Sequence, residues 1–415
     1  MRILWMIILP VWVFSQTYGL RDLIDHAHMH NPLMESSELR SKAKAKEVEA
    51  KQSAYWPTLD IGASYSRVNP NSLISPGEVA TGYASVGMEL YDGGRKSAQK
   101  RSKSFEHQAS LFEKNAFSKS VSLDIINRYY TIQKLKAILY ALDGQSKELQ
   151  AQMLRVKKFT AAGLATQEEI DKLQAVYEDN RYTIENTKLL LETQKENLQL
   201  MSGLPVKNIK NNQFVEPKHV EFEAYENSKI LQANANVLQE NAKAIDAGYK
   251  PRVILEDTYS KSHYDDLVNS GGFSTEGLLL DHQNKVTLSV NMRLFDHGKM
   301  KKEREAVIYQ KMALDAEHSY RVREQKMNFN LSGNNLKTIR VKLESASSAL
   351  RAAKSAYKSI VKKFEVGLVD NIAYLDALNE QTLAQARYEG TLYDYEIAKS
   401  IYYYYAGKDP KEFIR

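Results

Sequence analysis

Cysteine is absent from all 415 residues, so the chain has no disulfide framework and no thiol nucleophile. Long apolar runs are also absent after the first residues, and none reaches the ~18 apolar residues of a membrane-spanning helix. Catalytic signatures such as Gly-x-Ser-x-Gly or a phosphate-binding loop do not occur. We therefore expect neither an enzyme nor a helical membrane protein, and no cofactor.

A block of basic residues is missing as well. The 57 Lys and Arg residues are interleaved with 51 Asp and Glu residues, as on the solvated faces of long helices. This pattern does not favour nucleic acid as a partner.

The first 19 residues have the order of a secretory signal peptide. Met1 and Arg2 precede a nearly uninterrupted apolar run over residues 3–14, and small or polar residues follow at 15–19. We expect cleavage after Ser15 or after Gly19. An N-terminal anchor is the alternative.

Two long helices dominate the remaining sequence. Residues 95–162 and 299–366 each contain no proline and a single glycine, and each stretch ends at a Gly-Leu pair. At about 1.5 Å rise per residue, each helix is about 100 Å long. The second one carries an apolar seam at steps of three and four, the pattern of a coiled coil; its members are Leu336, Ile339, Leu343, Ala346, Leu350, Ala353, Tyr357, Ile360 and Phe364.

Short strands with alternating polarity precede each long helix. They are expected at 58–66, 84–91, 252–260 and 286–295. Their length matches the ~9 to 11 residues with which a tilted strand crosses a bilayer. Four strands cannot close a membrane barrel, so further copies of the chain must supply the rest: two copies give eight strands and three give twelve.

The chain repeats itself. Asp92 and Asp296 are separated by 204 residues (296 − 92), and so are Gly163 and Gly367. The first repeat, 20–206, runs through a helix, the strands 58–66 and 84–91, the long helix 95–162, a tip and a return helix at 166–202. After a linker at 207–222, the second repeat, 223–415, has a helix, the strands 252–260 and 286–295, the long helix 299–366, a tip and a return helix at 370–406.

Several short motifs in this order resemble the TolC-type outer-membrane efflux channel protein family, over essentially the whole mature chain. They are Asn31-Pro32, Tyr55-Trp56-Pro57, Tyr249-Lys250-Pro251, Tyr91-Asp92-Gly93-Gly94-Arg95, Phe295-Asp296-His297-Gly298-Lys299 and the two Gly-Leu tips. The resemblance implies a mainly α fold with four transmembrane β-strands per chain, a homotrimer with a twelve-stranded barrel in the cell outer membrane, and a periplasmic α-helical tunnel.

The family also implies the function of an exit duct in a tripartite efflux or type I secretion system. Such a duct passes solutes from a periplasmic adaptor (membrane fusion) protein and an inner-membrane pump to the exterior. The residues that carry over as adaptor contacts are Ala162, Gly163 and Leu164 on the first tip, and Val366, Gly367, Leu368 and Asp370 on the second. The first tip has Ala162 where the family usually has valine.

A narrow periplasmic entrance is the second site that the resemblance implies. Asp376 matches one acidic position of the family there, whereas Ala373 departs from the other, so Asp370 is the further candidate. Three copies of Asp376 around one axis would favour cations.

Other readings remain open from the sequence. An exported coiled-coil scaffold or adhesin without a pore would explain the helices, although it has no need of the strands. His26, His28 and His30 invite a zinc hypothesis, but no partner set with metal spacing accompanies them, so we expect no metal. The transported substrate has no signature.

Overall fold

The computed structural model describes residues 17–72, 74–218, 220–267 and 279–415. Residues 1–16 of the predicted signal peptide lie outside the described residues. The elements in chain order are β1 (Thr17–Tyr18), α1 (Leu20–His30), α2 (Pro32–Ser53), β2 (Thr58–Arg67), β3 (Glu78–Tyr91), α3 (Arg95–Ala161), α4 (Gln167–Ser202), β4 (Asn208–Ile209), α5 (Glu226–Asp246), η1 (Ala247–Tyr249), β5 (Arg252–Asp265), β6 (His282–Asn291), α6 (Lys299–Glu365), α7 (Asn371–Tyr405) and η2 (Pro410–Phe413).

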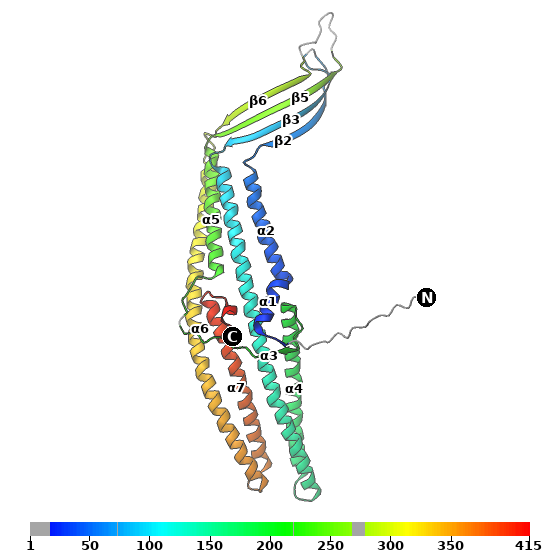
Figure 1. Ribbon diagram of the computed structural model, residues 1–415, viewed down its shortest axis with the longest axis vertical. Helices are drawn as coiled ribbons and strands as arrows, with labels where there is room; N and C mark the ends of the chain where they lie inside the picture. The colour runs from blue at the N-terminus through cyan, green and yellow to red at the C-terminus, as the bar shows by residue number, and fades with distance from the viewer. Residues whose placement is uncertain (1–16, 73, 219, 268–278) are drawn as a thin grey trace, which may run out of the picture. The chain divides into compact units, whose positions relative to one another are not determined.

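The chain divides into two compact units. We call residues 17–38, 113–226 and 321–415 the helical unit, and residues 39–112 and 227–320 the sheet unit. The helical unit holds two antiparallel helical hairpins, α3 with α4 and α6 with α7 (Figure 1). Its main apolar core combines α1, α3, the end of α4 and the last residues of the chain; the fully buried members include Leu20, Leu23, Ile24, Ile125, Ile126, Tyr129, Tyr130 and Leu198.

Asn31 separates α1 from α2 for a clear local reason. Pro32 occupies the first position of α2, where its missing N–H costs nothing. The Asn31 side chain accepts a hydrogen bond from the backbone N–H of Leu33 at 2.8 Å and donates one to the carbonyl of Met201 at 2.9 Å. One residue therefore caps the new helix and fastens it to the end of α4.

The linker between the two repeats is held by polar side chains of the helical unit. The hydroxyl of Tyr403 donates to the carbonyl of Val215, and Lys399 donates to the carbonyl of Phe214. The carboxylate of Glu396 accepts the backbone N–H of Phe214 at 2.7 Å. Lys399 and Glu396 also form an ion pair at 2.7 Å, with side chains only 5% and 8% exposed.

The apolar seam predicted on the second long helix is present in α6. Ala346 and Leu350 are buried, and the other seam residues within the helical unit are half-buried, whereas most residues between them are exposed. The seam packs against α7, in which Tyr374 and Leu378 are buried. The predicted coiled-coil seam is thus the surface along which α6 packs against α7.

The sheet unit contains one four-stranded antiparallel sheet in the order β2-β3-β5-β6. All four strands have their helix connections at one end of the sheet, to α2, α3, η1 with α5, and α6 (Figure 1). Among the described residues, no helix is long and apolar enough to cross a membrane. The fold class predicted from the sequence, long helices with a small β part, is confirmed.

The strand predictions were wrong at several ends. The strand expected at 84–91 begins at Glu78, and the one expected at 252–260 continues to Asp265, because β3 and β5 pair along their whole length. The strand expected at 286–295 begins earlier, at His282, and ends at Asn291. Asn291 pairs with Arg252, and the preceding Pro251 has no N–H with which to extend the ladder.

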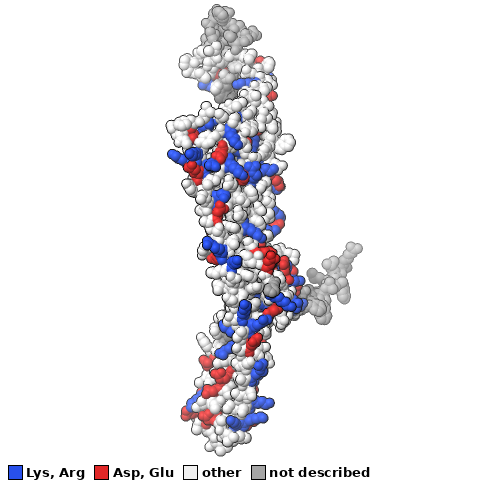
Figure 2. Space-filling view, turned by 90° about the vertical axis from the view of Figure 1, so that its left-hand side faces the viewer, with Lys and Arg blue, Asp and Glu red and all other residues white. Residues whose placement is uncertain are grey.

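Charged side chains of both signs are interspersed on the visible face of the helices (Figure 2). Many of them form exposed pairs within one helix, such as Lys188 with Glu185 at 2.8 Å. This is the solvated helix surface that the interleaved charges predict.

Candidate functional site: the helix tips and the sheet

Both hairpin tips are closed by the same glycine-dependent hydrogen bonds. Gly163 has φ +72°, its N–H donates to Thr160, and the N–H of Leu164 donates to the carbonyl of Phe159 at 2.8 Å. Gly367, with φ +75°, does the same with Phe364, while Leu368 donates to Lys363 at 2.9 Å. This is the Schellman arrangement, which requires a left-handed residue at the glycine position.

The tip side chains point into solvent. Leu164, Val366 and Leu368 are 76%, 70% and 74% exposed. A Cβ added at either tip glycine would meet no atom within 4 Å, so glycine is needed there for its φ angle alone. Helix termination explains the glycines, but it does not explain three exposed aliphatic side chains at the two tips.

The two tips pack side by side in the helical unit. The Arg155 guanidinium lies 5.5 Å from the ring centre of Phe159 and 5.6 Å from that of Phe364, and so joins α3 to α6 by cation–π contacts. Beneath it, Val156 of α3 and Leu173 of α4 share a core with Tyr374 of α7. Burial raises the pKa of the Tyr374 hydroxyl.

A cavity of about 490 Å³ opens between the tips. Its lining includes Arg155, Leu164 and Lys172 from the first hairpin, and Gly367 and Asn371 from the second. Asn371 is only 5% exposed, and neither its amide nitrogen nor its amide oxygen has a hydrogen-bond partner among the described residues. A buried amide without partners carries a desolvation penalty that a bound partner can remove.

This unpaired amide leads to a stability prediction. We expect Asn371→Leu to raise the unfolding free energy by about 1 kcal/mol, because it removes a buried polar group without breaking a hydrogen bond. The measurement is denaturant unfolding of the detergent-solubilised protein, followed by circular dichroism.

Asn180→Leu is the matched control for that prediction. Asn180 is also 5% exposed, and its amide oxygen has no partner among the described residues, but its amide nitrogen donates to the carbonyl of Leu142 at 3.1 Å. Its replacement breaks this hydrogen bond and is therefore expected to destabilise the fold. Equal destabilisation by both substitutions would show that Asn371 has polar partners in solution.

The two predicted acidic residues differ in their surroundings. Asp370 is the N-cap of α7, where its carboxylate accepts the backbone N–H of Ala373 at 2.9 Å. Asp376 is exposed, two residues from the buried Tyr374 and Leu378 on either side, and forms no ion pair among the described residues. Asp370 thus has a local structural role as a helix cap, which was not predicted from the sequence, whereas Asp376 caps no helix in the described part of the chain.

The sheet has one mainly apolar and one mainly polar face; the mainly apolar face also carries Lys261, His263 and Asp265 at the loop end of β5. Directly opposed residues of neighbouring strands share a face, and one row holds Leu59, Val86, Asp257 and Val286. The apolar side chains of this face, several of them more than 60% exposed, are Leu59, Ile61, Ala63, Tyr65, Ala84, Val86, Met88, Val253, Leu255, Tyr259, Val286, Leu288 and Val290. The other face carries Asp60, Ser64, Thr81, Ser85, Glu256, Thr258, Ser260, Thr287 and Ser289.

An exposed apolar face over four strands fits contact with lipid on one side and with water on the other. Tyr65 and Tyr259 lie on the apolar face. Tyr83 and Tyr264 lie on the polar face, opposite Ser260 and Val79.

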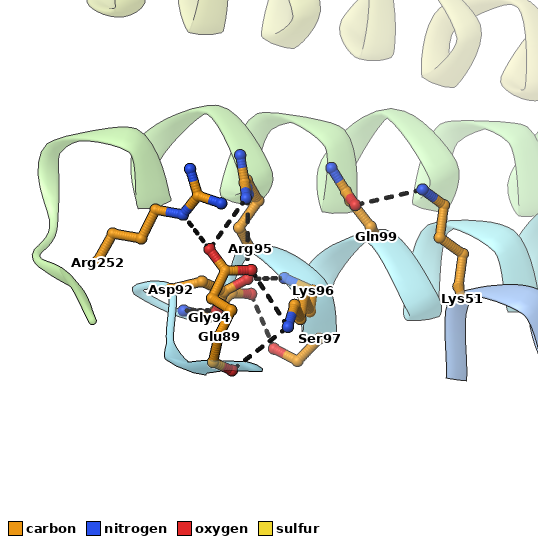
Figure 3. Close-up of polar contacts among 9 residues, drawn as sticks. All are labelled: Lys51, Glu89, Asp92, Gly94, Arg95, Lys96, Ser97, Gln99 and Arg252. Carbon is orange, nitrogen blue, oxygen red and sulfur yellow. Dashed lines mark hydrogen bonds and ion pairs between the residues drawn. The ribbon is translucent and has the colours of Figure 1, made fainter. Parts of the chain in front are cut away.

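A cluster of charges at the helix end of the sheet was not anticipated from the sequence. Glu89, near the end of β3, accepts from Arg95, Lys96 and Arg252 (Figure 3). Asp92 caps α3, since its carboxylate accepts the backbone N–H groups of Gly94 and Lys96. The signal in the sequence was an acidic residue after an uncharged stretch at 79–88, followed by basic residues at the start of the next helix.

The three histidines have structural partners. The Nδ1 atom of His26 lies 2.6 Å from the carbonyl of Ser202, and His28 Nε2 lies 3.0 Å from the hydroxyl of Ser122. Burial, with a smaller effect from the charge of Lys411, lowers the pKa of His28. Within the described part of the chain, no three His, Cys, Asp or Glu side chains are placed to hold a metal ion.

An antiparallel sheet with one exposed apolar face, joined at one end to long helices, defines the class of outer-membrane channels with a periplasmic helical part. A sequence model of the family described as "Outer membrane efflux protein" matches residues 23–204 and 223–400. The chain belongs to this family, and the resemblance predicted from its motifs is confirmed.

Solved structures share the fold across nearly the whole chain. The outer membrane protein VceC from Vibrio cholerae is 16% identical, with a TM-score of 0.78 over 94% of this chain and 96% of that one. The Campylobacter jejuni CmeC outer membrane channel is 15% identical, with a TM-score of 0.81 over 94% and 85%. The open state of the Neisseria gonorrhoeae MtrE outer membrane channel is 16% identical, with a TM-score of 0.77 over 94% and 89%.

No curated protein sequence matches the chain. The family match establishes an efflux channel of the outer membrane whose helical part lies in the periplasm. Neither the family nor the shared fold favours the alternative of a coiled-coil scaffold or adhesin. The family is one of channels, in agreement with the expectation that the chain is not an enzyme.

Proposed function

We propose that the protein is the homotrimeric exit duct of a tripartite efflux or type I secretion system. Three copies close a twelve-stranded barrel, with β2 of one copy beside β6 of the next. The observation that carries this proposal is the four-stranded sheet, which has one exposed apolar face and two outer edges that no other strand of the described residues covers. An open edge is not tolerated in lipid, so neighbouring copies must cover both edges.

The two tips dock a periplasmic adaptor protein, which connects the duct to an inner-membrane pump. Ala162, Gly163 and Leu164 form the first contact, and Val366, Gly367, Leu368 and Asp370 form the second. The exposed Leu164, Val366 and Leu368 support this proposal, as does the unpaired amide of Asn371 in the cavity between the tips. The pump selects the cargo, because a wide duct carries few contacts that discriminate between solutes.

Asp376 narrows the periplasmic entrance and makes it cation-selective. This proposal is supported by the position of Asp376 near the tips and by the exposure of its carboxylate. Among the described residues, this carboxylate caps no helix and forms no ion pair. Asp370 is the second candidate at the entrance, and its carboxylate is held at the N-terminus of α7, where it accepts the backbone N–H of Ala373.

Detergent extraction followed by gel electrophoresis tests the oligomeric duct. The mature protein is expected to require detergent and to run as a trimer without heating and as a monomer after boiling. A folded, helix-rich monomer that is extracted by salt alone would contradict the proposal. Such a result would favour the alternative of a coiled-coil scaffold or adhesin without a pore.

The entrance leads to a selectivity prediction. Asp376→Asn is expected to lower the cation preference of the open channel, because three fixed negative charges are removed from one constriction. The measurement is the reversal potential in a planar bilayer under a salt gradient. Glu168→Gln is the control, since Glu168 is an exposed carboxylate paired with Lys172 on α4. Equal cation selectivity in the native protein and in Asp376→Asn would show that Asp376 does not line the constriction.

A further inference from the structure

A cavity of about 840 Å³ lies at the helix end of β6, in the sheet unit. Its lining combines basic side chains with apolar ones: Arg95, Lys250, Arg252 and Arg293 on one hand, and Leu294, Phe295 and Met300 on the other. Leu294 and Phe295 are 80% and 73% exposed. No strand of the described chain covers this side of β6, which is an outer edge of the sheet.

The cations of this cavity are not all neutralised. Arg252 and Arg95 are bound to Glu89, as Figure 3 shows. Lys250 and Arg293 form no ion pair among the described residues. Two unpaired cations beside exposed apolar side chains are suited to the face of an aromatic ring, and tryptophan is the aromatic residue that binds cations best.

The other outer edge of the sheet presents such a ring at the same level. Trp56 is 74% exposed and lies two residues before Thr58, the first residue of β2. The sheet connects to its helices at one end, so the start of β2 and the end of β6 both lie at that end.

Pairing between copies brings these two features together. In the register of the sheet, Thr58 lies opposite Gly87, on the polar face that also holds Asn291 and, by alternation, Arg293. Directly opposed residues share a face. When β2 of a neighbouring copy pairs with the end of β6, its Thr58 therefore lies opposite Asn291 or Arg293. Its Tyr55 and Trp56 then extend past the strand end, beside Leu294 and Phe295.

We propose that Trp56 of a neighbouring copy fills this cavity and completes it. The indole packs on Leu294 and Phe295, and Lys250 and Arg293 lie against its face. This inference rests on the proposed barrel closure and adds to it a specific contact just outside the strands. The contact fixes the register between copies at the junction of the sheet with the helices.

The absence of cysteine makes cross-linking a clean test. We expect the double variant Trp56→Cys with Phe295→Cys, treated with a short bis-maleimide, to form covalent dimers and trimers. Neither single variant forms them. The pair Ile74→Cys with Phe295→Cys is the control, because Ile74 is 80% exposed in the loop at the opposite end of β2. All these positions are exposed, so the variants are expected to fold.

Fluorescence gives a second measurement on the unaltered protein. Tryptophan occurs only at positions 5, 12 and 56, so removal of the predicted signal peptide leaves Trp56 as the only one. We expect the trimer to show blue-shifted Trp56 emission. Neither acrylamide nor lipids with brominated chains are expected to quench this emission. Phe295→Ala is expected to shift the emission to the red and to expose Trp56 to acrylamide.

The outcomes separate this inference from the proposed function. Cross-linking between positions 56 and 295, together with Trp56 emission that is protected from quenching, supports the placement of the Trp56 indole in the cavity. A conducting, heat-labile trimer without this cross-link, in which brominated lipid quenches Trp56, would overturn the inference and leave the duct intact; Trp56 would then be a membrane-interface anchor. A folded protein that forms no oligomer overturns both.

Discussion

Replacement of Lys399 by methionine is expected to lower the free energy of unfolding by about 3–5 kcal/mol, the usual cost of removing one partner from a buried ion pair. Lys399 and Glu396 are almost completely buried, and together they bind both the N–H and the carbonyl of Phe214. Without the ammonium group, the carboxylate keeps a single backbone donor. The linker at 207–222 loses one of its attachments to α7.

The measurement is denaturant unfolding of the detergent-solubilised protein, followed by the helical circular dichroism signal. Lys188→Met is the matched control, since Lys188 and Glu185 have the same i,i+3 spacing and a similar distance of 2.8 Å, but side chains 54% and 64% exposed. Water screens this pair, so a much smaller loss is expected. Equal effects of the two substitutions would show that water reaches the pair at Lys399.

The second large effect is expected at the tips. Leu368→Asp and Leu164→Asp should each reduce efflux from cells to the level of a strain without the protein. Both leucines are more than 70% exposed in the single chain, so the substitutions leave the fold intact. A carboxylate placed in a docking interface has to lose its hydration, and this cost cancels the binding energy.

Leu200→Asp is the control for the tip variants. Leu200 lies near the end of α4, away from the tips, and is 79% exposed. The measurement is retention of a fluorescent dye in cells that express each variant at equal levels in the outer membrane. Normal efflux with Leu164→Asp and Leu368→Asp combined would exclude these tips as the docking surface.

Much of the fold could be predicted because its elements are long and periodic. The seam from Leu336 to Phe364 has the period of a helix, and Leu59, Ile61 and Tyr65 have the period of a strand. The 204-residue offset then relates the features of one half to those of the other.

The ends of the strands could not be predicted, since they depend on partners far away in the sequence. The segment around Gly77 and Gly82 has the residue types that are typical of a loop. β3 nevertheless begins at Glu78, because Glu78 pairs with Arg67 of β2 on one side and with Asp265 of β5 on the other. Met292 and Leu294 continue the alternation of β6 after the ladder has ended. Local pattern gives the period of a strand, whereas pairing decides its length.

The tip residues were identified from a family resemblance, and their chemistry emerged only from packing. The glycine positions carry a sequence signal, because a helix ends there. The contact of Arg155 with two rings and the unpaired amide of Asn371 have no such signal. Both depend on the two hairpins lying side by side, and residues about 200 positions apart show no periodicity that would reveal this.

Single-channel recording shows directly whether the protein forms a conducting channel. The protein is extracted in detergent, purified as the unboiled oligomer and inserted into a planar bilayer. We expect discrete, cation-selective openings whose selectivity falls in Asp376→Asn. A folded, oligomeric preparation that inserts into the bilayer and never conducts would contradict the assignment as an outer-membrane channel.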